Sequence, residues 1–96
     1  MIKKYEGEKF DSLKGVYIVD FYADWCGPCR MLGMILEQLE NVNILKVNVD
    51  EHEDLAKEYK VMSIPYLLLI KDGEVKKELI GFRSKEDLEE EIKSIG

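Results

Sequence analysis

The stretch VYIVDFYADWCGPC, residues 16–29, contains the pattern that decides the fold of this 96-residue chain. Its first seven residues are apolar on both alternating faces except at Asp20, which is typical of a strand covered on both sides by other elements. Two cysteines, Cys26 and Cys29, then stand where this strand gives way to a helix. We therefore predict a buried central strand that leads directly to a cysteine pair.

The spacing of Cys26 and Cys29 lets the two sulfurs meet across one turn without distorting the strand or the helix. Pro28 fits the first helical position, where its missing N–H was unpaired anyway, and we expect Gly27 to let the chain turn tightly. Cys26 then lies just ahead of the helix N-terminus, whose free N–H groups and dipole favour a thiolate. We expect Cys26 to attack and the more covered Cys29 to resolve the mixed disulfide.

The same cysteine spacing occurs in half of a zinc site, in haem attachment and by chance. A structural zinc site needs about four ligands, and beyond the cysteines the chain offers only His52. Haem attachment needs a histidine after the second cysteine, where this chain has Arg30. His52 is most simply a solvated residue at a helix start, so we expect no metal and no cofactor besides a redox-active Cys26–Cys29 disulfide.

Short apolar runs alternate with helical patterns along the rest of the chain, which indicates an α/β fold. The expected strands are residues 2–5, 16–22, 43–49, 66–71 and 74–80. Helices are expected from Pro28, at 53–59 and from Ser84, with a weak helical turn at 10–13. Asp72-Gly73 joins the last two strands and predicts an antiparallel hairpin, so the sheet should be mixed.

Two of the predicted helices carry an apolar stripe that should face the sheet. In the helix after the cysteines the stripe is Met31, Leu32, Ile35, Leu36 and Leu39. In the closing helix it is Leu88, Ile92 and Ile95, behind an approximate capping box formed by Ser84 and Asp87.

Composition and charge exclude several classes of protein. A chain of 96 residues is long enough for one domain, which we assign to residues 1–96. Its 20 acidic against 14 basic residues give a net charge of -6, which argues against nucleic acid as a partner. The longest apolar run, residues 64–70, is far shorter than a membrane-spanning helix. Charges at Lys3 and Lys4 precede any apolar signal segment, so we expect a cytoplasmic protein.

The run VDFYADWCGPCRM, residues 19–31, closely resembles the active-site signature of the thioredoxin family. The similarity continues through residues 46–50, 64–65 and 71–75 and Gly81, in the family's order, and so covers most of the chain. The resemblance implies the thioredoxin fold, with a mixed central sheet of four to five strands flanked by helices on both faces. It also implies a monomeric dithiol–disulfide oxidoreductase that reduces protein disulfides and is re-reduced by a thioredoxin reductase or an equivalent donor.

The resemblance also implies roles for single residues. It makes Cys26 the nucleophile, Cys29 the resolving thiol and Asp20 the buried carboxylate that exchanges a proton with Cys29. Burial on an apolar strand would independently raise the pKa of Asp20 toward values useful for acid–base chemistry, although a carboxylate at a strand end can instead point to water. Lys46 corresponds to the family's lysine near that carboxylate; its alternative is a surface lysine on a strand edge.

Pro65 matches the family's cis-proline, which overrides the usual preference of X–Pro bonds for trans. The backbone before it would be free to pair with an extended substrate segment. The residues expected to bind substrate are Trp25, Gly27, Pro28, Ile64, Pro65 and Gly81, with Tyr66 and Phe82 on the same apolar rim.

Some features bear on the choice of partner. Gly33-Met34 stands where many members have a kinking proline, and Tyr66 replaces a common threonine and should place a phenol near the groove. Gly27-Pro28 between the cysteines favours a reductase over an oxidant, in which a histidine is more usual. Two alternatives stay open: a carrier dedicated to one redox system, and a non-catalytic binding module that keeps the cysteines incidentally.

Overall fold

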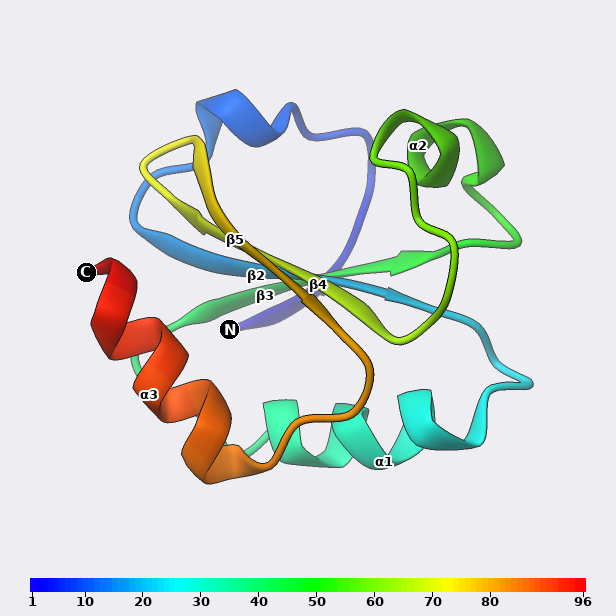
Figure 1. Ribbon diagram of the computed structural model, residues 1–96. Coiled ribbons are helices and arrows are strands. Elements are labelled where there is room, and N and C mark those ends of the chain that lie inside the picture. The colour runs from blue at the N-terminus through cyan, green and yellow to red at the C-terminus, as the bar shows by residue number, and fades with distance from the viewer.

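A five-stranded sheet forms the centre of the computed structural model, which describes residues 1–96 (Figure 1). Its strands, in spatial order, are β1 (Ile2–Lys4), β3 (Asn43–Asn48), β2 (Val16–Tyr22), β4 (Tyr66–Lys71) and β5 (Glu74–Ile80). β1 and β2 run parallel to β3, while β4 is antiparallel to both β2 and β5. The predicted mixed sheet is confirmed.

Helices cover both faces of this sheet. Figure 1 shows α1 (Gly27–Leu36) and α3 (Lys85–Ile95) on one face and α2 (Glu53–Glu58) on the other, together with a 3-10 helix at Phe10–Ser12. None of the helices is long and apolar enough to span a membrane.

Each face of the sheet closes over its own apolar cluster of nine buried residues. β2 contributes to both, because successive side chains of a strand point to opposite faces. Ile18 belongs to the cluster under α1 and α3, whereas Val19 and Phe21 belong to the cluster under α2. The central strand is therefore buried on both sides, as its apolar sequence predicted.

The start of α1 differs in detail from the expectation. Cys26 is the N-cap and Gly27 the first helical residue, so Pro28 occupies the second position rather than the first. The proline still lies in the first turn, where backbone N–H groups have no partner within the helix. The tight turn expected at Gly27 is wrong, because this residue is already part of the helix.

The apolar stripe of α1 is shorter than predicted. Leu32 and Leu36 are buried against the sheet, whereas Met31 is 59% exposed and lies on the outer side of the helix. The helix ends at Leu36, and Leu39 packs against the same cluster from the segment that follows.

The remaining boundaries lie close to the predicted ones. β1, β3 and α2 are each one residue shorter at their carboxyl ends than expected. The predicted cap of α3 is confirmed, since the hydroxyl of Ser84 accepts a hydrogen bond from the N–H of Asp87 at 3.1 Å.

The predicted hairpin between β4 and β5 is confirmed, with φ of +49° at Asp72 and +82° at Gly73. Two consecutive positive φ values define the turn type that Asp-Gly favours. Gly73 is also constrained by its neighbour, because a Cβ there would collide with the backbone carbonyl of Asp11. Because residue 73 has no side chain, the hairpin turn can pack directly against the segment before β2.

We predict that Gly73→Ala lowers the free energy of unfolding by about 2 kcal/mol, from the strained φ and the collision with a backbone atom that cannot rotate away. Gly15→Ala is the matched control, because Gly15 has the same φ of +82° but open space around its Cβ position. Gly15→Ala should lower the free energy of unfolding only by the cost of the left-handed conformation, about 1 kcal/mol. Urea unfolding at pH 7 measures both, and equal losses would show that the contact with Asp11 is unimportant.

Candidate active site

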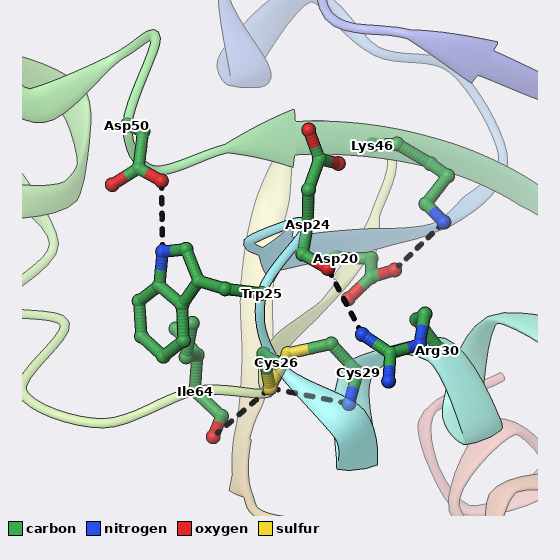
Figure 2. The surroundings of a disulfide bond; sticks show 9 residues. All are labelled: Asp20, Asp24, Trp25, Cys26, Cys29, Arg30, Lys46, Asp50 and Ile64. Carbon is green, nitrogen blue, oxygen red and sulfur yellow. Dashed lines mark hydrogen bonds and ion pairs between the residues drawn. A yellow bond between two sulfur atoms is a disulfide. The ribbon is translucent and has the colours of Figure 1, made fainter.

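Cys26 and Cys29 form a disulfide at the N-terminus of α1 (Figure 2). Their Cα atoms are 5.2 Å apart, within the usual range for a bridge. The sulfur of Cys26 takes the place of a capping side chain and accepts a hydrogen bond from the backbone N–H of Cys29 at 3.2 Å. When the disulfide is reduced, a thiolate at Cys26 therefore has an N–H donor already directed at it.

The loop before β4 covers the other side of Cys26. Its Sγ lies 3.9 Å from the carbonyl oxygen of Ile64, and the Ile64–Pro65 peptide bond is cis, as the resemblance implied. Cys26 is 6% exposed and Cys29 is 3% exposed. Because these values are close, the position of Cys26 at the helix end distinguishes the two cysteines better than exposure does.

Asp20 lies on β2 with no solvent exposure and no hydrogen bond to either carboxylate oxygen. Figure 2 draws it between the ammonium of Lys46 and the turn of α1 that carries Cys29. Burial raises the pKa of Asp20 to about 6, and the positive charge of Lys46 opposes the rise. The alternative of a carboxylate pointing to water is excluded, and Asp20 can change its protonation near neutral pH.

Lys46 is the direct neighbour of Asp20 across the parallel pair of β2 and β3. Its Nζ is 3.6 Å from Oδ2 of Asp20, which is an ion pair rather than a hydrogen bond. The same ammonium lies 4.5 Å from the centre of the Tyr22 ring. Its side chain is 27% exposed, so Lys46 is not the surface lysine of the alternative interpretation.

Trp25 stands beside the disulfide with 69% of its surface exposed. Its indole N–H donates a hydrogen bond to Asp50 at 2.9 Å, which fixes the ring (Figure 2). Trp25 and Ile64 together line a mostly apolar hollow of about 360 Å³. The other lining residues were not predicted: Val49, Ala56, Val61, Met62 and Ser63. They come from three separate segments, so no local pattern in the sequence groups them.

The other expected rim residues lie differently. Gly81 is next to Pro65, whose carbonyl accepts its N–H at 2.9 Å, while the half-exposed Phe82 does not line the hollow. The expectation that Tyr66 places a phenol near the groove is wrong. Tyr66 is buried, its ring packs edge-on against Phe21, and its hydroxyl donates to Glu78 on β5.

His52 lies at the start of α2, where its ring packs edge-on against the ring of Tyr5 at 4.9 Å between centroids. No group of three or more His, Cys, Asp or Glu residues is arranged to hold a metal ion.

Comparisons with known proteins agree with this geometry. The family model described as Thioredoxin matches residues 2–94. The thioredoxin of Chlamydia pneumoniae is 47% identical and the match covers 92% of each chain; that of Bacillus subtilis strain 168 is 46% identical over 83% of this chain and 82% of its own. A solved mutant thioredoxin from Halobacterium salinarum NRC-1 has a TM-score of 0.88 at 35% identity, covering 97% of this chain and 88% of that one. This chain, with its cysteine pair at disulfide distance, is therefore a member of the thioredoxin family and a dithiol–disulfide oxidoreductase of the thioredoxin type.

Proposed function

We propose that Cys26 is the nucleophile that attacks a protein disulfide and that Cys29 resolves the mixed disulfide. The observation that carries this assignment is the N–H of Cys29, directed at Sγ of Cys26 from 3.2 Å at the end of α1. That hydrogen bond and the helix dipole both stabilise negative charge on Cys26. Its thiolate attacks one substrate sulfur, the substrate disulfide breaks, and the electron pair leaves on the other substrate sulfur.

Cys29 completes the transfer of two electrons. Its thiolate attacks Sγ of Cys26, and the bond between Cys26 and the substrate breaks. The substrate sulfur that Cys26 had attacked then leaves as a thiolate. The oxidised protein with the disulfide drawn in Figure 2 is the product. Thioredoxins act on protein disulfides with their own cysteine pair and no cofactor, and a thioredoxin reductase returns them to the dithiol. We propose the same class of electron donor for this chain.

Asp20 is the proposed base for Cys29. The thiol of Cys29 must lose its proton before it attacks, and it is only 3% exposed, so bulk water has little access to it. A buried carboxylate with a pKa raised to about 6 is ionised at neutral pH and can take that proton, directly or through a water. Lys46 supports the role because its charge favours the ionised carboxylate.

Substrate binding is proposed at the surface around Cys26. The candidate residues are Trp25, Gly27, Pro28, Ile64, Pro65 and Gly81. An extended substrate segment would lie along the backbone before Pro65, close to the Ile64 carbonyl that is 3.9 Å from the reactive sulfur. The hollow beside Trp25 would accept an apolar side chain next to the substrate cysteine.

We also propose that residues 1–96 act as one domain and as a monomeric electron carrier in the cytoplasm. Two features support a single domain: one sheet joins all five strands, and each of its faces closes over its own cluster. The net charge of -6 supports protein rather than nucleic acid as the partner.

The test of the proton transfer is Asp20→Asn. Without a base, Cys29 must lose its proton to water, so we expect resolution of the mixed disulfide to slow about 100-fold at pH 7. In the native protein the rate of mixed-disulfide resolution should rise as pH increases through about 6, where Asp20 ionises. The variant should lack this rise with pH. Acid-quenched single-turnover samples analysed by mass spectrometry give the fraction of mixed disulfide. Equal rates for both proteins from pH 6 to 9 would remove Asp20 from the mechanism.

A further inference from the structure

The ammonium of Lys46 lies in a slot between the sheet and α1. Two of its neighbours come from β2: Oδ2 of Asp20 at 3.6 Å and the ring of Tyr22 at 4.5 Å from its centre. The third is Gly33 of α1, where a Cβ would lie 3.3 Å from Nζ of Lys46. This is tighter than an ordinary van der Waals contact, so a side chain at residue 33 would require the ammonium to shift by a few tenths of an ångström.

Gly33 has no explanation within the helix itself. It lies in the interior of α1, where glycine is less favourable than alanine. Its φ lies outside the left-handed region that favours glycine, and no backbone atom outside the helix approaches its Cβ position within 4 Å. The first atom that a side chain would meet is the Nζ of Lys46. The absence of a side chain at Gly33 thus leaves room for the ammonium of Lys46.

We propose that Gly33 is a positioning residue for proton transfer: it leaves the space in which the ammonium of Lys46 approaches Asp20. The inference rests on the proposed role of Asp20 as a base. Tyr22 holds the same ammonium through its ring, so residues 22 and 33 bound the slot on different sides. A methyl group at position 33 would make the ammonium move by a few tenths of an ångström. A longer side chain would displace it toward solvent, which the flexible and partly exposed Lys46 can reach.

The consequence is a change in the proton affinity of Asp20. Lys46 is the charged group that opposes the effect of burial on this carboxylate. Its attraction for Asp20 weakens as the two charges separate and as water screens the displaced ammonium. Other titratable groups near the slot are Tyr22, Lys4 beside Lys46 on β1, Asp24 and Glu51, whose charges act on Tyr22, and the two cysteines at the start of α1. In the oxidised protein the cysteines do not titrate, so Asp20 can be followed alone.

The experiment is an NMR titration of the carboxyl carbon of Asp20 in oxidised protein. We expect the titration midpoint to rise in the order native protein, Gly33→Ala, Gly33→Leu, with Gly33→Leu reaching the value of Lys46→Met. The double variant Gly33→Leu with Lys46→Met should titrate like Lys46→Met alone, because position 33 acts through the ammonium. Met34→Leu is the matched control on the exposed face of α1 and should titrate like the native protein.

Two results would overturn the inference. One is an Asp20 titration midpoint equal to that of the native protein in Gly33 variants that circular dichroism shows to be folded. If Gly33→Leu does not fold, Gly33→Ala is the variant that decides. The other is a double variant that titrates higher than Lys46→Met, because position 33 would then act without Lys46. Failure of the proposed function looks different: the midpoint would move while the pH dependence of mixed-disulfide resolution stays unchanged.

Discussion

Cys26→Ser is expected to abolish the reduction of a protein disulfide, whereas Cys29→Ser should stop the same reaction halfway, as a covalent complex with the substrate. The first variant lacks the sulfur that attacks. The second keeps the sulfur that is stabilised at the helix end, but has no thiol to break the bond that forms. Released thiols measure the first effect, and non-reducing electrophoresis with mass spectrometry measures the second.

The comparison contains its own control, because both variants lose the native disulfide and differ only in which sulfur is left. Met31→Leu, on the exposed outer side of α1, should keep the native rate. A stable complex with Cys26→Ser and none with Cys29→Ser would reverse the assignment of the two cysteines. Native function in both variants would instead favour a binding module that keeps its cysteines incidentally.

Asp20→Asn is expected to gain stability relative to the native protein as pH rises. The pKa of Asp20 is raised from 3.8 to about 6 in the folded state, so between these values the native state holds a proton that the unfolded chain releases. Native stability therefore falls as pH increases from about 4 to about 6, and Asn, which does not ionise, removes this loss. Two pKa units correspond to about 3 kcal/mol, which is the expected change in the stability difference between pH 4 and pH 7.

Urea unfolding of the two oxidised proteins from pH 4 to pH 7 measures this difference. The buried amide of the variant can change the free energy of unfolding by an amount that does not depend on pH. That amount cancels, because only the change of the stability difference with pH is compared. Asp24→Asn is the matched control at an exposed carboxylate near the site and should follow the native curve. A stability difference that does not change with pH would mean that Asp20 is ionised in the folded protein at pH 4, against the burial that we describe.

Features that depend on neighbouring residues could be predicted from the sequence. The apolar run of β2, the cysteine turn into α1, the Asp72-Gly73 hairpin and the Ser84 cap each follow from contacts within a few residues of the chain. The exposure of Met31 shows the limit of this reasoning. A helical period identifies a stripe of apolar residues, but which part of the stripe is covered depends on where the sheet lies beneath the helix.

The sequence alone predicts a cysteine pair at the start of a helix, directly after a strand that carries one carboxylate. Tertiary structure decided the surroundings that give these groups their chemistry. The register of β2 against β3 pairs Asp20 with Lys46, the hollow that Trp25 lines draws on four segments of the chain, and the side chain of Tyr66 points into the core rather than toward the groove. The position of Gly33 over Lys46 belongs to the same group. These relations join residues far apart in the chain, and their distances exist only once the helices have packed on the sheet.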